Sequence, residues 1–145
     1  MSTRGARRQA REAALQVLYA ADVSDRLSPE GVELVYQQVE GEFSLPSRSR
    51  PRALELALGV QLNLKRIDER IGLASRRWRV ERLATVDRNI LRIATYELLF
   101  ELDTPVEVII DEALEVARRF SSEPSTAFVN GVLDEIARDR TNPPR

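Results

Sequence analysis

Apolar residues recur along this 145-residue chain at the spacing of α-helices, and no stretch keeps the alternation of a β-strand. The first predicted helix covers residues 6–22, and its apolar stripe consists of Ala10, Ala14, Val17, Leu18 and Ala21. A second helix follows Ser28, a typical N-cap residue, and has Pro29 at its first position. Its stripe consists of Val32, Val35, Tyr36, Val39 and Phe43.

A polar loop at 41–52 precedes a predicted long third helix. The apolar stripe of that helix consists of Leu56, Val60, Leu64, Ile67 and Ile71. Because this stripe runs without a break, it predicts a single helix that continues to Ile71. The charged segment 74–82 then predicts a connection between two halves of the protein.

The second half of the chain is more hydrophobic. The segment 85–102 is apolar around most of its circumference, which predicts a buried central helix with Thr85 as its cap. Thr104 and Glu107 have the spacing of a capping box, with Pro105 at the first helical position of the next helix. The segment 121–125 separates this helix from the last one.

We therefore expect an all-α protein of six or seven helices. The charged connection divides it into an N-terminal bundle over 1–77 and a C-terminal bundle over 78–139, and a disordered tail follows over 140–145. No apolar run approaches the ~20 residues that span a bilayer, and the basic N-terminus lacks the apolar stretch of a signal peptide. We expect no membrane contact and a cytoplasmic location.

The residue types that most enzymes use for catalysis are missing. The chain has no histidine and no cysteine, and its glycines form no phosphate-binding loop. The carboxylates of Asp111, Glu112 and Glu115 have the spacing of solvated helical pairs with Arg118 and Arg119. The sequence therefore predicts a protein that is not an enzyme and has no cofactor and no metal.

Basic residues gather at the N-terminus although the chain has a net charge of −1. On a helix, Arg4, Arg7, Arg8 and Arg11 fall within an arc of about 100°, and the first acidic residue is Glu12. Positive charge at a helix start opposes the helix dipole, so the arrangement favours an anionic partner over a merely solvated face. Because the neighbouring arc consists of small alanines, a membrane surface is disfavoured.

Nucleic acid is the anion that this pattern favours, and RNA is favoured over duplex DNA because no helix-turn-helix pattern is present. All but one of the chain's 22 basic residues are arginine, the exception being Lys65. Arginine suits phosphates and base edges, although GC-rich codon usage explains the same excess.

Three stretches resemble the NusB family of bacterial transcription antitermination factors. They are ARRQAREAALQVLYAAD (6–22), DRNILRIATYELL (87–99) and PVEVIIDEALEVARRFSSEPSTAFVNGVLDEI (105–136). Trp78 also stands where the family often has a tryptophan. The resemblance runs from about residue 4 to residue 139 and is weakest between 23 and 75.

The resemblance implies two roughly perpendicular helical bundles and no catalysis. It implies binding of the single-stranded boxA element of ribosomal RNA transcripts, jointly with NusE, a ribosomal small-subunit protein, within the RNA polymerase antitermination complex. Some members of the family pair, so a second copy of the chain is a further candidate partner.

The resemblance also implies roles for individual residues. The implied RNA contacts are Arg4, Arg7, Arg8, Arg11, Arg92, Phe128 and Asn130, and the implied NusE contacts are Asp87 and Glu81. Each has a structural alternative. Arg92 can extend its charged end from a buried helix to the surface, and Phe128 can pack in the core. Asn130 can form a hydrogen bond between two helices. Asp87 can place its negative charge in the first turn of its own helix, where the helix dipole favours it. Gly131, in the middle of a helix, predicts a close approach of two helices.

The chain departs from the family pattern at three positions, which bear on the contacts of one loop. Asp111 replaces the usual asparagine, Ser121 replaces a frequent glycine, and Pro124 stands where many members have charged residues.

Two other functions remain as alternatives. One is the NusB-like module of a ribosomal RNA methyltransferase, which requires this chain to be a fragment. The other is a helical protein–protein adaptor without RNA contact, whose binding would not depend on salt.

Overall fold

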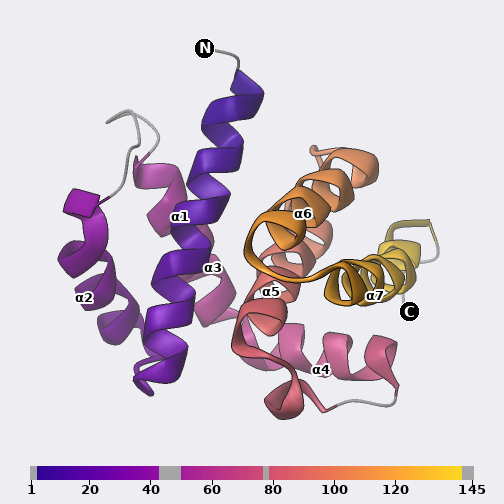
Figure 1. Ribbon diagram of the computed structural model, residues 1–145, viewed down its shortest axis with the longest axis horizontal. Coiled ribbons are helices and arrows are strands. Elements are labelled where there is room, and N and C mark those ends of the chain that lie inside the picture. Colours follow the sequence, from indigo (N-terminus) through magenta and orange to yellow (C-terminus); the bar gives the residue numbers. More distant parts are fainter. Residues whose placement is uncertain (1–2, 43–49, 77–78, 142–145) are drawn as a thin grey trace. The chain divides into compact units, whose positions relative to one another are not determined.

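The computed structural model describes residues 3–42, 50–76 and 79–141, with the backbone alone at positions 3, 4, 6 and 141. These residues form seven α-helices, two short 3₁₀ helices and no strand, which confirms the all-α prediction (Figure 1). In chain order the elements are α1 (Thr3–Val23), α2 (Pro29–Val39), η1 (Glu40–Glu42), α3 (Arg50–Leu62), α4 (Leu64–Ser75), η3 (Val80–Arg82), α5 (Thr85–Phe100), α6 (Val106–Phe120) and α7 (Glu123–Thr141).

The chain forms two compact units, Met1–Asn63 and Leu64–Arg145. The expected boundary, between residues 77 and 78, lies one helix later than this division. The difference arises because α4 packs against α5 and α7 of the second unit. Trp78, Phe43 and positions 142–145 of the predicted tail lie outside the described residues.

Unit 1 consists of α1, α2 and α3, each of which contacts the other two. The predicted stripe of α1 is buried, and Ala13 and Leu15 widen it. Ser28 caps α2 as expected, because its hydroxyl accepts a hydrogen bond from the backbone N–H of Gly31 at 3.0 Å. A Cβ at Gly31 would lie 2.2 Å from the carbonyl oxygen of Arg26, so only glycine fits the turn that joins α1 to α2.

The predicted long third helix is wrong, because it ends at Leu62 and a new helix begins at Leu64. Between them the side chain of Asn63 donates a hydrogen bond to the carbonyl oxygen of Gly59 at 2.8 Å. A short amide side chain of this kind competes with the helical backbone for its acceptors. The stripe that predicted one helix therefore belongs to two cores, with Leu56 and Val60 buried in unit 1 and Ile67 and Ile71 buried in unit 2.

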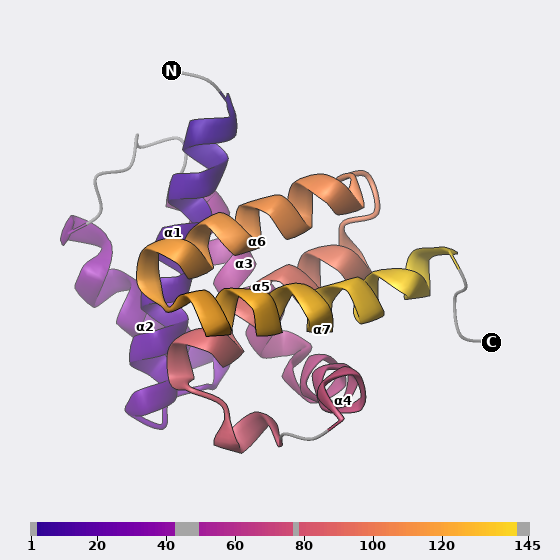
Figure 2. The same cartoon turned by 45° about the vertical axis from the view of Figure 1, so that its right-hand side comes forward.

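Unit 2 is built around α5, whose residues are mostly buried, as the apolar circumference predicted. α5 contacts α4, α6 and α7, and α7 also contacts α4 and α6 (Figure 2). The core of this unit contains Leu91, Leu98, Ile109, Leu133 and Ile136, each with less than 2% of its surface exposed.

Several predicted helix ends differ in detail from the structure. Ala84 rather than Thr85 precedes α5, and Pro105 rather than Thr104 precedes α6, so neither predicted side-chain cap forms. The last helix begins earlier than expected, at Glu123. Its start is capped by Ser122, whose hydroxyl accepts a hydrogen bond from the N–H of Ser125 at 3.2 Å.

The predicted tail is wrong at Arg140, which lies inside α7 and is held by hydrogen bonds. Its side chain bonds to carbonyl groups at the end of α5, which fixes this part of the chain in unit 2. Within the described residues, no helix has the length and apolarity that crossing a membrane requires. The same residues contain no group of side chains that could hold a metal ion.

Candidate nucleic-acid interface

The arginines of α1 differ in how far they reach the surface. Arg7 is exposed and Arg8 is half-buried, whereas Arg11 has only 7% of its surface exposed. The side chain of Arg4 lies outside the described residues. Arg8 and Arg11 both interact with other groups of the protein. The prediction of one exposed edge is therefore wrong at Arg11, and Arg7 with the accessible part of Arg8 remains for a partner.

The burial of Arg11 follows from an apolar residue that the predicted stripe omitted. Leu15, four residues after Arg11, is 4% exposed and extends the packed face of α1 over this position. The rest of the local pattern holds. The first turn of α1 contains no acidic residue, and the buried alanines at 10 and 14 hold the helix against unit 1.

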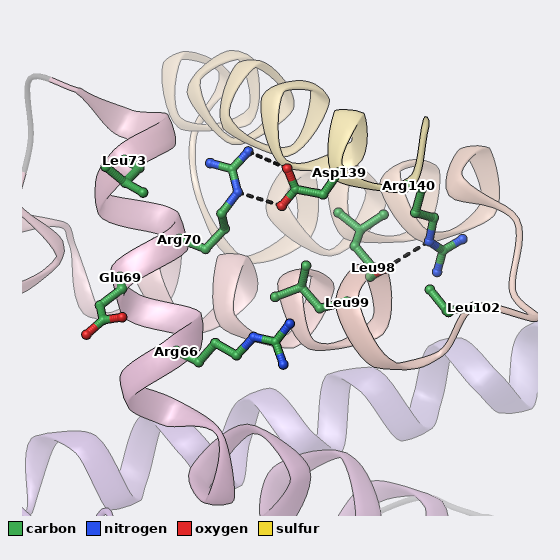
Figure 3. A pocket seen from close by; sticks show the side chains of 9 residues that line it. All are labelled: Arg66, Glu69, Arg70, Leu73, Leu98, Leu99, Leu102, Asp139 and Arg140. Carbon is green, nitrogen blue, oxygen red and sulfur yellow. Dashed lines mark hydrogen bonds and ion pairs between the residues drawn. The ribbon is translucent and has the colours of Figure 1, made fainter. Parts of the chain in front are cut away.

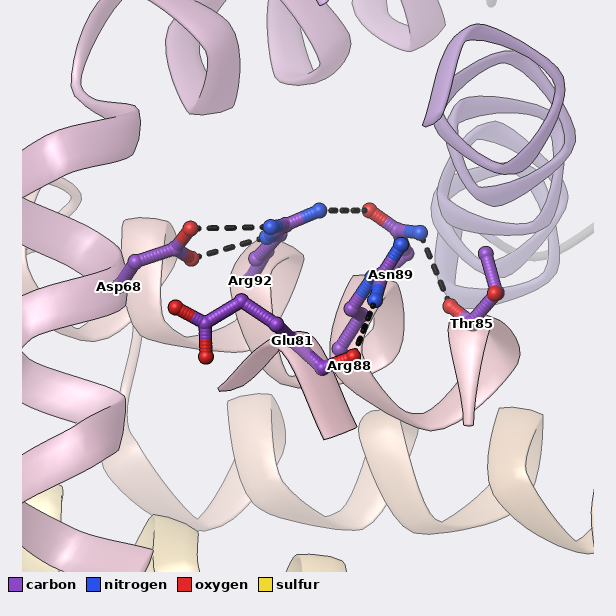
Figure 4. A network of polar contacts seen from close by, with 6 residues as sticks. All are labelled: Asp68, Glu81, Thr85, Arg88, Asn89 and Arg92. Atoms are coloured by element: carbon purple, nitrogen blue, oxygen red, sulfur yellow. Dashed lines mark hydrogen bonds and ion pairs between the residues drawn. The ribbon is translucent and has the colours of Figure 1, made fainter. Parts of the chain in front are cut away.

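Arg92 of α5 is buried and makes an ion pair with Asp68 of α4 (Figure 4). Its Nε and Nη2 donate to the two carboxylate oxygens of Asp68, both at 2.9 Å, and its Nη1 donates to Oδ1 of Asn89 at 3.0 Å. Asn89 in turn donates to the carbonyl oxygen of Thr85 at 2.9 Å. Such a two-pronged pair is strong and fixes geometry. The structure therefore supports a positioning role, joining α4 to α5, for a residue that was expected to contact RNA.

Sequence reasoning did not identify Asp68 or Asn89 as part of this network. Asn89 is fully buried, and Asp68 retains 27% side-chain exposure. Their positions, three residues before Arg92 and on a separate helix, carry no motif. The signal that was available is Asn89 itself, because a polar residue on a helix that is apolar around its circumference requires a hydrogen-bond partner.

Phe128 and Asn130 of α7 are both half-buried. For Phe128 this is the state that leaves part of the ring accessible, as its predicted role in stacking on RNA requires. Gly131 differs from expectation. It is exposed, and a Cβ built there would have no neighbour within 4 Å. The predicted close approach of two helices at Gly131 is therefore wrong.

Asp87 lies in the first turn of α5 but does not face solvent, because it is 7% exposed. Its carboxylate accepts hydrogen bonds from the hydroxyls of Ser121 at 2.7 Å and Ser125 at 2.9 Å. It therefore fixes the corner between α6 and α7, a role that neither the predicted NusE contact nor the helix-start alternative included. Glu81, the second predicted NusE contact, is exposed on η3.

The carboxylates of α6 do not all behave as the sequence predicted. Glu115 pairs with Arg118 at 2.6 Å on the surface, as expected. Glu112 was expected to be solvated, but it is fully buried and interacts inside the protein. Glu97 of α5 is also buried, with 1% exposure.

A pocket of about 680 Å³ opens within unit 2 between α4, α5 and α7 (Figure 3). Most of the polar side chains that line it already contact other groups of the protein. Arg70 makes a two-pronged ion pair with Asp139, at 2.7 and 3.0 Å, which raises the pKa of Arg70. Arg140 donates to the carbonyl oxygens of Leu98, Thr104, Glu97 and Glu101. These contacts are structural, since they join α7 to the last turn of α5 and to the loop that follows it.

The predicted site residues are thus distributed over both units. Unit 1 supplies the arginines of α1, and unit 2 supplies Phe128 and Asn130 on α7. Arg92 and Asp87 are drawn into the internal contacts of unit 2. In unit 1 the arginines of α1 can bind an anion, and in unit 2 the accessible part of Phe128 can stack on a flat ring.

The comparisons with known proteins agree on one family. The model of the NusB family matches residues 8–138. The transcription antitermination protein NusB of Sorangium cellulosum (strain So ce56) is 44% identical over 135 residues, which cover 93% of this chain and 94% of the relative. That of Geobacter sulfurreducens is 46% identical over 133 residues, covering 92% and 94%. Both relatives bear the name transcription antitermination protein.

Solved structures give the same result. NusB of T. maritima is 36% identical and superposes with a TM-score of 0.79, covering 96% of this chain and 93% of that one. A structure of the antitermination factors NusB and NusE in complex with double-stranded RNA contains a chain that is 26% identical, with a TM-score of 0.78 and coverage of 92% and 96%. With a family model matched over most of its length and relatives above 40% identity, the chain belongs to the NusB family.

Proposed function

We propose that this chain is an RNA-binding antitermination factor that binds the boxA element of ribosomal RNA transcripts together with NusE. The observation that carries the proposal is the one-signed start of α1. Arg7 is exposed there, no acidic residue precedes Glu12, and the packed alanines hold the helix in place. Each phosphate that such an edge neutralises releases counterions and adds salt-dependent affinity.

In this proposal the residues divide into contacts and supports. Arg4, Arg7 and Arg8 meet the phosphates, while Phe128 and Asn130 meet a base. Arg11 and Arg92 support the fold, because both are buried and engaged. Supporting residues of this kind fix the helices that carry the contacts.

NusE contact is proposed for the surface around Glu81 and the corner that Asp87 holds. Asp87 acts there through Ser121 and Ser125 and not by direct contact, because its carboxylate accepts both hydroxyls. The RNA polymerase antitermination complex and a cytoplasmic location follow from action on a nascent transcript. A homodimer stays a prediction, which light scattering of the free chain over a concentration series tests.

The test is a mobility-shift or anisotropy titration with boxA RNA and a scrambled RNA, each with and without NusE, at several salt concentrations. We expect tighter binding to boxA and a further gain with NusE. In the Arg7→Gln, Arg8→Gln double variant, the slope of log K against log salt should fall by about 1.4, or ~0.7 for each lost contact. Arg11 is left unchanged in this test because its loss would disturb the packed face of α1.

The matched control is the Arg118→Gln, Arg138→Gln variant, which removes the same charge from exposed surface pairs. We expect its slope to equal that of the wild type. Binding to boxA and scrambled RNA with equal affinity, unaffected by NusE, would contradict the proposal. So would a slope that stays the same in the α1 variant, which is the behaviour expected of a protein–protein adaptor.

A further inference from the structure

Three arginines flank and form the connection between α4 and α5 without an internal contact. Arg76, Arg79 and Arg82 are exposed, and within the described residues none of their side chains makes a hydrogen bond, an ion pair or a ring contact. We refer to Arg76, Arg79 and Arg82 as the η3 arginine cluster. The proposed function places NusE near Glu81, which lies between Arg79 and Arg82, but it gives these three arginines no role.

The cluster contrasts with the rest of unit 2. Every other arginine described in this unit has a partner in the protein. Four pair with carboxylates, namely Arg70 with Asp139, Arg92 with Asp68, Arg118 with Glu115 and Arg138 with Glu135. Two lie over aromatic rings, Arg66 over Phe100 and Arg119 over Phe120, and two donate to backbone carbonyls, Arg88 to that of Glu81 and Arg140 to that of Leu98. Among the residues of this unit that the structure describes, guanidinium groups without a partner therefore occur only at positions 76, 79 and 82.

The backbone holds two of these arginines on the same side of a turn. The N–H of Arg82 donates to the carbonyl oxygen of Arg79 at 2.9 Å, and residues three apart eclipse each other in a 3₁₀ turn. Val80 is 8% exposed and anchors the turn, while Arg88 donates to the carbonyl oxygen of Glu81 at 3.2 Å (Figure 4). Arg79 and Arg82 thus extend from a fixed backbone.

Arg76 occupies a position that does not suit its residue type. Directly after the end of α4 its φ is 50°, in the left-handed region where glycine or asparagine is preferred. An arginine there costs conformational free energy, and no contact within the described residues compensates for it. This second observation suggests that the charge at Arg76 serves a partner.

We propose that the η3 arginine cluster is a second contact for RNA phosphates, in unit 2, in addition to the arginines of α1. This inference rests on the proposed function. RNA is favoured over an acidic protein because the segment 79–82 offers no apolar anchor. Its one apolar side chain, Val80, is buried, whereas protein interfaces require an apolar centre.

The test uses the full chain and a single-stranded RNA that contains boxA and extends beyond it on both sides. We expect the Arg76→Gln, Arg79→Gln, Arg82→Gln variant to lower the slope of log K against log salt by about 2, from three lost contacts of ~0.7 each. The corresponding triple lysine variant should retain most of the slope, because lysine also binds phosphates as a point charge.

Two controls separate this effect from general charge and from folding. The Arg118→Gln, Arg119→Gln, Arg138→Gln variant has the same net charge, and we expect its slope to equal that of the wild type. Arg76→Asn should weaken RNA binding while the melting temperature stays the same or rises, because asparagine adopts the left-handed region more readily. If Arg76 had only a structural role, Arg76→Asn would lower the melting temperature.

The outcomes distinguish this inference from the proposed function. If the Arg7→Gln, Arg8→Gln variant loses slope and the cluster variant does not, the second contact is wrong and the proposed function stands. If neither variant loses slope, both are wrong. If the cluster variant keeps its RNA affinity but no longer binds poly-glutamate that the wild type binds, the partner of the cluster is an acidic protein and the inference is overturned.

Discussion

At the scale of single residues, the arginines of this chain fall into two groups that differ in what their guanidinium groups contact. Arg70, Arg92 and Arg140 are bound to carboxylates or backbone carbonyls in fixed geometry. Arg7 and the η3 arginine cluster have no such contact among the described residues. A sequence cannot separate these groups, because the partners of the first group are distant in the chain. Asp139, for example, lies 69 residues after Arg70.

Arg92 provides a test of this division. We expect Arg92→Ala and Asp68→Asn to destabilise the protein similarly, by about 2–4 kcal/mol, because each removes one partner of a largely buried ion pair. The measurement is urea unfolding of both variants. In RNA titrations under conditions where they are folded, neither variant should change the salt slope. A slope lower by about 0.7 in Arg92→Ala alone would restore Arg92 as a phosphate contact.

At the scale of helices, most elements are predictable from the apolar period, and the errors have identifiable causes. The helices α1, α2, α5 and α6 lie close to their predicted ranges, and Ser28 caps α2 as expected. The break at Asn63 is not predictable, because one continuous stripe contributes to two cores. The burial of Asp87 is likewise not predictable from the sequence, since its partners Ser121 and Ser125 approach it only in the folded state.

The end of α5 depends on a single side chain of α7. Arg140 donates to three carbonyl oxygens there and to that of Thr104 in the next loop, and its positive charge interacts favourably with the negative end of the helix dipole. We expect Arg140→Gln to lower the free energy of unfolding by about 2–3 kcal/mol. Hydrogen exchange should show faster opening at the end of α5.

Arg138, on the same helix, is the matched control. It makes an exposed pair with Glu135 at 3.1 Å, so Arg138→Gln should change stability by no more than about 0.5 kcal/mol. Equal losses in the two variants would show that the carbonyl contacts of Arg140 contribute nothing beyond surface charge.

At the scale of the whole molecule, a chain with net charge −1 pairs most of its described arginines, and the described side chains without an internal contact are those of Arg7, Arg26 and the η3 arginine cluster. The local arrangement of charge therefore determines binding more than the total does. Family membership and the all-α fold could be predicted from the sequence. Which arginines of the candidate site are accessible could not, because accessibility depends on the packing of Leu15 and on distant carboxylates such as Asp68.

The absence of histidine from the sequence predicts how binding responds to pH. No side chain has an ordinary pKa between 5 and 8, and arginine stays charged throughout this range. We expect RNA affinity at constant salt to change by less than about twofold between pH 6 and pH 8. Fluorescence titrations across this range measure it, and a tenfold change would mean that another titrating group controls the site.

The alkaline limit of stability depends in part on Tyr36, which donates to the carbonyl oxygen of Arg50 at 3.0 Å. Burial, and then the nearby Glu40, raise the pKa of Tyr36 above its ordinary value. Its stabilising contribution is therefore complete below the unfolded pKa of about 10 and is lost as pH rises through the folded pKa. Tyr36→Phe should weaken this alkaline loss, which thermal unfolding at high pH would reveal.

We expect the two groups of arginines also to differ in which substitutions they tolerate. Arg70 and Arg92 each grip both oxygens of a carboxylate, a geometry that a lysine ammonium cannot reproduce. At Arg7, Arg79 and Arg82, by contrast, a bare positive charge satisfies the proposed role. Arg70 and Arg92 thus require the planar guanidinium group, whereas Arg7, Arg79 and Arg82 require only a positive charge. We therefore expect an arginine-to-lysine substitution to be neutral only at Arg7, Arg79 and Arg82.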